Sequence, residues 1–163
     1  MTESTSVLFV CMGNICRSPT AEGVFRRAVE QTGLMGRIRI ESCGTGGWHV
    51  GKAPDRRAVA AAKARGIDIA GLRAQQFADE DLQRFDYVLV MDRANLADLV
   101  RVWQRRGGTQ PELFLTYGSA FDVEEVPDPY YGGEQGFDYV LDLIEDASKG
   151  LLNHIRSVHF EPR

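Results

Sequence analysis

Apolar and polar residues along the 163-residue chain follow two spacings, and these spacings predict the elements of the fold. Short apolar runs rich in β-branched residues are typical of buried strands. Stretches with apolar residues three and four positions apart are typical of amphipathic helices. Strands are expected at residues 6–11, 37–41, 86–91 and 112–115. Helices are expected at residues 18–32, 54–65, 96–107 and 137–155.

This regular alternation of strands and helices favours an α/β fold. It is typical of a parallel sheet with helices on both faces, that is, of three layers. No repeat, linker or low-complexity tract divides the sequence, so we expect one domain over residues 1–163. Ligands of such sheets bind beyond the carboxyl ends of the strands. Cys11 ends the first predicted strand, so Cys11 and the residues after it are candidates for a ligand-binding or catalytic site.

Composition mainly excludes classes of function. Hydrophobic residues make up 44% and charged residues 26%, as in an ordinary globular protein, and the net charge of −4 argues against general nucleic-acid binding. No apolar run reaches the ~18 residues of a membrane span, and the N-terminus lacks a secretory signal. We expect a cytoplasmic protein without membrane contact, with export by a route that needs no signal peptide as the alternative. The three cysteines and three histidines have no zinc-site or disulfide-framework spacing, so neither a metal nor a cofactor is expected.

Residues 11–19 read Cys-Met-Gly-Asn-Ile-Cys-Arg-Ser-Pro and join the first strand to the first helix. Ser18 and Pro19 predict that this helix begins at once, with Ser18 as its N-cap. Gly13 and Asn14 tolerate left-handed backbone conformations, so successive N–H groups can turn inward. The segment therefore predicts a compact loop that surrounds one anion. Neither a Walker loop nor a dinucleotide-binding glycine motif is present.

The chemistry of this loop suits phosphate. Its N–H groups and the positive end of the helix dipole form an anion cradle, and Arg17 adds a bidentate fork. The same field favours the thiolate form of Cys11, the form of cysteine that acts as a nucleophile. Cys11 can then accept a phosphoryl group while the cradle holds the charge that develops, so the predicted mechanism needs no metal.

A general acid is also needed, because an alkoxide or phenolate leaves poorly without a proton. Asp128 is the best candidate, since the two prolines of Val-Pro-Asp-Pro-Tyr-Tyr at residues 126–131 stiffen its segment. Tyr130 and Tyr131 offer aromatic walls for an aryl substrate. Three other carboxylates of this loop have no such fixed direction: Asp122, Glu124 and Glu125.

Together these segments closely resemble the low-molecular-weight protein tyrosine phosphatases. The resemblance covers nearly the whole chain and rests on residues 10–22, 48–58, 85–92 and 128–131. It implies the fold of that family, a four-stranded parallel sheet flanked by helices, with a phosphate-binding loop after strand 1. It also implies hydrolysis of aryl phosphate monoesters through a phosphocysteine, with phosphotyrosine-containing proteins as substrates.

The resemblance further implies roles for individual residues. Cys11 is the nucleophile, Arg17 the phosphate clamp, and Asp128 the general acid and later the base. Asn14, Ser18 and Ser42 hold the loop by hydrogen bonds. The substrate-binding residues that the resemblance implies are Met12, Gly13, Asn14, Ile15, Cys16, Ser18, Trp48, His49, Tyr130 and Tyr131.

The same resemblance implies regulation by oxidation. Cys16 corresponds to a second thiol that forms a protective disulfide with Cys11 under oxidation. For assembly we expect mostly a monomer; exposed tyrosines at Tyr130 and Tyr131 either support a weak dimer contact or serve only the substrate. Many relatives also brace the loop asparagine with a histidine, whereas this chain reads Gly-Leu-Arg-Ala-Gln at residues 71–75. The brace is therefore expected to be absent.

Three alternatives stay open at this point. Arsenate reductases of similar fold share the cysteine loop but use further cysteines later in the chain, where only Cys43 remains here. Arginine phosphatases of the same family carry Thr at the position of Ile15, and the Tyr130–Tyr131 pair also favours phosphotyrosine. The third alternative is a catalytically silent phosphate-binding module.

Overall fold

The sheet places the residues of interest at the end of its central strand. The computed structural model describes residues 4–129 and 134–160. In this part of the chain four strands form one parallel sheet in the order β2-β1-β3-β4. They are β1 (Thr5–Cys11), β2 (Ile38–Gly44), β3 (Tyr87–Val90) and β4 (Glu112–Leu113). The four strands predicted from the sequence are confirmed, although β4 is shorter than expected.

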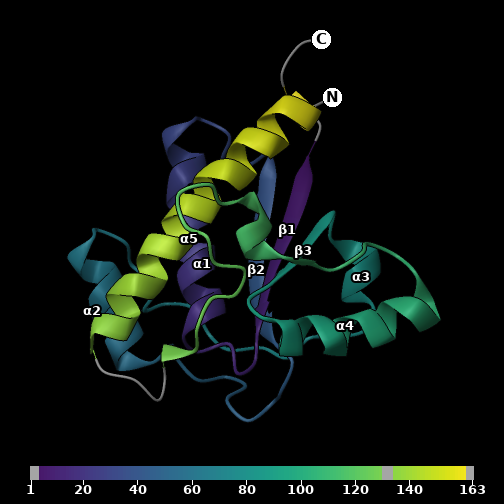
Figure 1. Ribbon diagram of the computed structural model, residues 1–163, viewed down its shortest axis with the longest axis horizontal. Coiled ribbons are helices and arrows are strands. Elements are labelled where there is room, and N and C mark those ends of the chain that lie inside the picture. Colours follow the sequence, from purple (N-terminus) through teal and green to yellow (C-terminus); the bar gives the residue numbers. More distant parts are fainter. Residues whose placement is uncertain (1–3, 130–133, 161–163) are drawn as a thin grey trace.

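Helices cover both faces of the sheet, so the predicted three-layer α/β fold is confirmed. They are α1 (Arg17–Gln31), α2 (Arg56–Ala64), α3 (Asp81–Arg84), α4 (Arg93–Arg106) and α5 (Glu134–Ile155). Short turns of 3₁₀- and π-helix lie at Phe114–Tyr117 and Arg156–Phe160. In Figure 1, α1, α2 and α5 lie on one side of the strands, and α3 and α4 lie on the other. No helix in the described ranges is long and apolar enough to cross a membrane.

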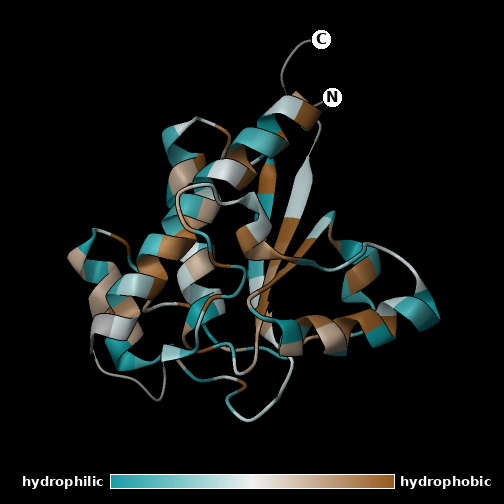
Figure 2. Cartoon of the chain, viewed as in Figure 1, coloured by the Kyte–Doolittle hydropathy of each residue, from teal (hydrophilic) through white to brown (hydrophobic). Residues whose placement is uncertain are grey.

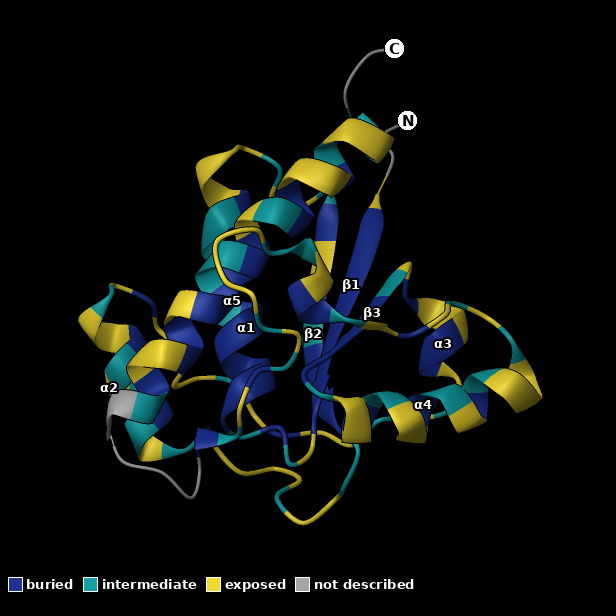
Figure 3. Cartoon of the chain, viewed as in Figure 1, coloured by how far each residue is buried: buried dark blue, intermediate teal, exposed yellow. Residues whose placement is uncertain are grey.

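Alternation along β1 divides the core between the two faces. Val7 and Phe9 belong to the larger apolar cluster, which includes residues of α1 and α5, whereas Leu8 and Val10 belong to the smaller cluster with residues of α4. This is the two-residue period of a strand with apolar neighbours on both sides. Figure 2 shows brown, hydrophobic stretches along the strands, and Figure 3 shows them largely dark blue and buried between the helices.

All four predicted helices begin at a residue other than the predicted one, and α4 and α5 each begin three residues early, at Arg93 and Glu134. Helix α1 begins at Arg17, and Cys16 precedes it without a side-chain cap, so the prediction of Ser18 as N-cap was wrong. The Ser18 hydroxyl instead bonds the residues of the preceding loop. Helix α2 begins after Asp55, whose side chain accepts the N–H of Arg57. The short helix α3 was not predicted, because four residues show no helical period.

The strand order explains where a ligand site forms. From β1 the chain crosses to β2 on one side, and β3 lies on the other side of β1. The strand order reverses at this point, and α/β proteins bind ligands beyond the carboxyl ends of strands at such a switch. Cys11 is the last residue of β1. The topology therefore places its thiol at the switch point.

Candidate active site

The loop from Cys11 to Ser18 turns backbone and hydroxyl groups toward one sulfur. The Asn14 N–H lies 3.3 Å from Cys11 Sγ and donates to it, and Ser18 Oγ lies 3.0 Å from the same sulfur. Asn14 has a φ of 57°, and it is the one non-glycine residue with a positive φ in the described ranges. An asparagine tolerates this conformation better than most residues, because its short polar side chain bonds locally.

Gly13 does not share this conformation, contrary to the expectation from the sequence, since its φ is not positive. Its missing side chain serves a close approach instead. A Cβ on Gly13 would lie 3.0 Å from the ring of His49. The same holds more strictly for Gly44 at the end of β2, where a Cβ would lie 2.8 Å from the carbonyl oxygen of Met12. The loop is thus packed directly against the end of the neighbouring strand.

The carbonyl groups of the loop point toward that strand end. Thr45 N–H donates to the Cys11 carbonyl and Gly46 N–H donates to the Met12 carbonyl, each at 2.9 Å. These bonds occupy carbonyl oxygens that would repel an anion. The loop N–H groups are left as the groups that can face a phosphate.

The side chain of Asn14 links the loop to α1, to β2 and to the segment that carries Gln75. Its Nδ2 donates to Ser18 Oγ at 2.7 Å and to Ser42 Oγ at 3.0 Å. Its Oδ1 accepts the backbone N–H of Gln75 at 2.9 Å. The sequence predicted that Asn14 would lack its brace, because the family's histidine is missing. The structure shows a different brace, a backbone group from the segment that carries Gln75.

Arg17 is 3% exposed and reaches the cavity from the first turn of α1. Its Nη1 donates to Asp92 Oδ2 at 2.6 Å and to the Val126 carbonyl at 3.1 Å. Its Nη2 lies 3.7 Å from Asp128 Oδ2. Burial opposes the charge of Arg17, but negative charge at Cys11 and Asp92 raises its pKa above the ordinary value. The guanidinium is therefore a fixed cation.

Asp92 was not singled out from the sequence, although it belongs to the segment that carries the resemblance. Its Oδ1 accepts the N–H of Asn95 and caps α4, while its Oδ2 holds Arg17. One carboxylate thus fixes both a helix start and the guanidinium. A polar residue directly after a buried strand was the available signal, because such residues collect at the ligand end of a parallel sheet.

A cavity of about 460 Å³ opens above the loop. It is lined by Cys11, Met12, Gly13, Ile15, Cys16, Arg17, Trp48, His49 and Asp128. Asn14, Ser18 and Ser42 are buried behind this lining and contact the loop rather than the cavity. Tyr130 and Tyr131, also predicted to contact substrate, lie outside the described residues. The structure thus brings predicted site residues from three segments, around residues 11–17, 48–49 and 128, to one cavity.

Cys16 lines the cavity but is only 5% exposed. Burial, with added negative charge from Asp55, Cys11 and Asp128, raises the pKa of its thiol well above the ordinary range. Cys16 therefore stays protonated at neutral pH. As for metals, no group of three or more His, Cys, Asp or Glu side chains within residues 4–129 and 134–160 is placed to hold an ion.

Comparison with known proteins agrees with this geometry. Residues 6–159 match the model of the family described as low molecular weight phosphotyrosine protein phosphatase. The protein of that name from Schizosaccharomyces pombe is 44% identical over 95% of this chain and 99% of its own length. The low molecular weight protein-tyrosine-phosphatase YfkJ of Bacillus subtilis is 40% identical over 93% of this chain and 96% of its own length.

Solved structures show the same relationship. A crystal structure of a protein tyrosine phosphatase from Entamoeba histolytica, with Hepes in its active site, superimposes with a TM-score of 0.90. It is 34% identical and covers 94% of this chain and 98% of its own. The chain belongs to the low-molecular-weight phosphotyrosine protein phosphatase family. It is accordingly an enzyme, a protein-tyrosine phosphatase that removes phosphate from phosphoproteins, as the sequence predicted.

The contact between Asp92 and Arg17 gives a first prediction. Asp92→Asn keeps an oxygen that can cap α4 but places an amide against the guanidinium. We expect kcat/KM for an aryl phosphate to fall about tenfold or more, since a hydrogen bond between charged groups contributes about 1.5–3 kcal/mol. Asp98→Asn, an exposed carboxylate of the same helix, is the control. Equal kinetics in the two variants would show that Asp92 does not position Arg17.

Proposed function

We propose that the protein hydrolyses phosphotyrosine in proteins through a phosphocysteine intermediate on Cys11. One observation carries the proposal: Cys11 Sγ lines the cavity while it receives the Asn14 N–H at 3.3 Å and contacts the Ser18 hydroxyl at 3.0 Å. Donors directed at a sulfur favour its thiolate form. Arg17 lines the same cavity and supplies the cation that a phosphate dianion needs.

In the first step the Cys11 thiolate attacks phosphorus and the P–O bond to the tyrosine oxygen breaks. The electron pair of that bond goes to the leaving oxygen, which takes a proton from Asp128. Arg17 and the loop N–H groups hold the three remaining phosphate oxygens while charge redistributes. Two observations support this role: Asp128 lines the cavity, and its Oδ2 lies 3.7 Å from Arg17 Nη2.

In the second step water attacks the phosphocysteine. Asp128, now ionised, takes a proton from that water, and the P–S bond breaks with its electron pair returning to Cys11. The Ser18 hydroxyl stabilises the thiolate that leaves. Inorganic phosphate then departs and the thiolate is ready for another turnover.

The cavity walls support an aryl ester as substrate. Met12 and Trp48 are 40% and 69% exposed beside the cavity, and Ile15 adds a further apolar side chain. These side chains offer apolar contact that a phenyl ring uses and a short alkyl ester does not reach. Ile15 also stands where arginine phosphatases of the family carry Thr. Both features favour phosphotyrosine.

The arrangement of cysteines argues against arsenate reduction. Cys43 is 2% exposed and packs in the smaller core cluster, whereas Cys11 and Cys16 belong to the larger one. The thiol of Cys43 therefore faces the opposite side of the sheet from the cavity. A relay of oxidation from Cys11 through Cys43 would have to cross the sheet.

The pair of thiols at the cavity also supports a protective role for Cys16. A peroxide transfers OH to the Cys11 thiolate, which is oxidised to a sulfenic acid while the peroxide is reduced. The Cys16 thiol then attacks the Cys11 sulfur and passes its proton to the departing hydroxyl as the S–O bond breaks, so a disulfide forms and water leaves. The disulfide is reversible by thiols, whereas further oxidation of Cys11 is not.

The nucleophile assignment predicts the outcome of Cys11→Ser. Wild type hydrolyses p-nitrophenyl phosphate near pH 6, with no effect of EDTA and with inhibition by vanadate. Cys11→Ser shows no measurable turnover, because a serine hydroxyl is not ionised at this pH, and it still binds the phosphate ester by calorimetry. Appreciable turnover by this variant would exclude the cysteine mechanism. Binding without turnover by folded, reduced wild type would favour a silent phosphate-binding module.

The role of Asp128 predicts a dependence on the leaving group. In Asp128→Ala, kcat/KM for phenyl phosphate falls about 100-fold or more, the usual contribution of a general acid. The fall is much smaller for p-nitrophenyl phosphate, because nitrophenolate leaves without a proton. Both substrates are measured for wild type and variant under the same conditions. An equal loss on both would remove Asp128 from the acid role.

Peroxide tests the role of Cys16. Relative to its own activity before oxidation, Cys16→Ser recovers a smaller fraction than wild type does when dithiothreitol follows hydrogen peroxide, since no disulfide protects Cys11. Cys43→Ala is the control and recovers as wild type does. The disulfide of the oxidised wild type is identified by mass spectrometry of its peptides. Full recovery in Cys16→Ser would show that this thiol has no protective role.

A further inference from the structure

One face of α1 continues the polar network of the loop into the protein interior. Ser18, Glu22 and Arg26 are spaced four residues apart and therefore share a face of the helix. Glu22 is only 7% exposed, so its carboxylate lies inside the molecule rather than in solvent. The proposed reaction does not use it. A buried carboxylate is unfavourable unless other groups bind it, so its partners indicate why it is there.

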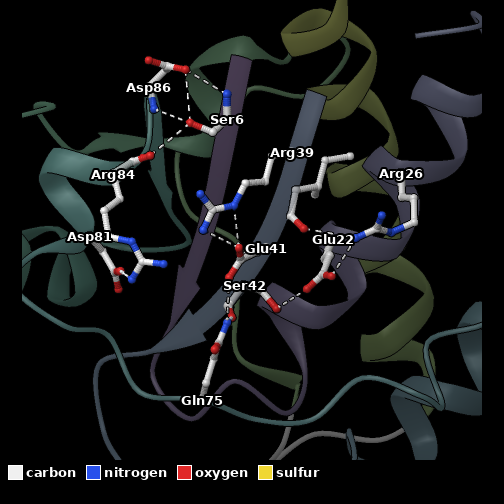
Figure 4. A network of polar contacts seen from close by, with 11 residues as sticks. Ser6, Glu22, Arg26, Arg39, Glu41, Ser42, Gln75, Asp81, Arg84 and Asp86 are labelled. Atoms are coloured by element: carbon white, nitrogen blue, oxygen red, sulfur yellow. Dashed lines mark hydrogen bonds and ion pairs between the residues drawn. The ribbon is translucent and has the colours of Figure 1, made fainter. Parts of the chain in front are cut away.

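The partners of Glu22 come from two directions. Its Oε1 accepts the hydroxyl of Ser42 at 2.7 Å, and its Oε2 accepts Arg26 Nη2 at 3.0 Å. The same Nη2 also donates to the Ile40 carbonyl of β2 at 3.1 Å. Figure 4 shows the Glu22 side chain between Ser42 and Arg26. Burial raises the pKa of Glu22, and the bonds from Ser42 and Arg26 favour its ionised form against that effect.

The directions of the hydrogen bonds are fixed from both ends. Asn14 Oδ1 accepts the Gln75 N–H, so the amide Nδ2 must point toward Ser18 and Ser42. An amide nitrogen donates only, so both hydroxyl oxygens accept from Asn14. Each hydroxyl must then place its own hydrogen elsewhere.

The two hydroxyls find different acceptors. Ser42 donates to Glu22, and Ser18 has Cys11 Sγ at 3.0 Å and the Cys43 carbonyl at 3.3 Å. A thiolate is the stronger acceptor of the two, because hydrogen bonds to charged groups are roughly twice as strong as neutral ones. The chain of bonds therefore runs without a break from a buried carboxylate to the sulfur.

We propose that Glu22 is a positioning residue for the reaction at Cys11. By accepting the hydrogen of Ser42, Glu22 leaves the Ser42 oxygen as an acceptor for Asn14. The amide of Asn14 is then held in the orientation in which it donates to Ser18, and Ser18 donates to the sulfur. Glu22 acts through these residues and does not touch substrate. The inference rests on the proposed role of Cys11.

Two conservative substitutions distinguish the effect of the length of the Glu22 side chain from the effect of its charge. Glu22→Gln keeps the length of the side chain and an oxygen that accepts from Ser42, but it loses the charge. Glu22→Asp keeps the charge, but it withdraws the carboxylate from Ser42 by one methylene group. Arg26 extends to the surface, with 37% of its side chain exposed, and can turn toward solvent in either variant.

The order of activities is the readout. We expect kcat of Glu22→Gln to stay within about threefold of wild type and kcat of Glu22→Asp to fall about tenfold, the effect of one lost hydrogen bond to a charged group. A role in charge balance with Arg26 alone would produce the opposite order, with Asp the milder change. That order, or wild-type kcat in Glu22→Asp, would overturn the proposal.

Combining Glu22→Asp with Ser42→Ala tests whether Glu22 acts on kcat through Ser42. In Ser42→Ala the bond to Glu22 is already absent, so Glu22→Asp should lower kcat by no more than about twofold there. A purely structural role of Glu22 would persist in this background, and an undiminished tenfold loss would contradict a path through Ser42. Glu30→Gln and Glu30→Asp, at an exposed carboxylate of the same helix, are the matched controls and should match wild type. Failure of the cysteine mechanism itself would appear separately, as turnover by Cys11→Ser.

Discussion

The amide of Asn14 is the contact on which the arrangement of the site depends. It joins the loop after β1 to Ser18 on α1, to Ser42 on β2 and to the backbone of Gln75. A left-handed residue is strained unless the structure around it compensates, and three hydrogen bonds from one side chain provide that compensation. With Asn14 in this conformation, its own N–H points at Cys11 Sγ. The shape of the loop and the polarity around the sulfur thus have one cause.

The parallel sheet makes this contact possible. Residues 14, 42 and 75 are far apart in the sequence, but the ends of neighbouring parallel strands meet at the same edge. Gly44 allows the end of β2 to approach the loop, because any side chain there would collide with the Met12 carbonyl. The bridge between Gly44 and Gln76 brings the third segment to the same place. A rigid edge formed from several segments can fix polar groups more precisely than a single loop can.

The sequence predicted the parts of this arrangement that depend on local pattern. Strand and helix periods predicted the sheet and its two covered faces, and the short loop with Cys11 and Arg17 predicted where the cavity lies. Hydrogen-bond partners that are set by tertiary packing could not be predicted from local sequence pattern. The position of Asp92 after a buried strand indicates the ligand end of the sheet but does not identify Arg17 as its partner, and the brace from Gln75 is a backbone group that almost any residue type would supply. The N-cap prediction for Ser18 was wrong, because a serine beside a helix start is usually a cap, whereas here its hydroxyl contacts Cys11 Sγ and Asn14 Nδ2, within the loop network that the resemblance implied.

The two carboxylates at Arg17 have different strengths of contact, and this difference suits a catalytic cycle. Asp92 Oδ2 lies 2.6 Å from Nη1, and Asp92 is fixed in turn by capping α4. Asp128 Oδ2 lies 3.7 Å from Nη2 and comes from a loop rather than a helix. A phosphate dianion that enters the cavity competes for the guanidinium more effectively with the distant carboxylate than with the close one. Arg17 can therefore bind substrate phosphate through Nη2 while Nη1 keeps its contact with Asp92. In the proposed reaction, Asp128 is the carboxyl group that gives its proton to the leaving oxygen.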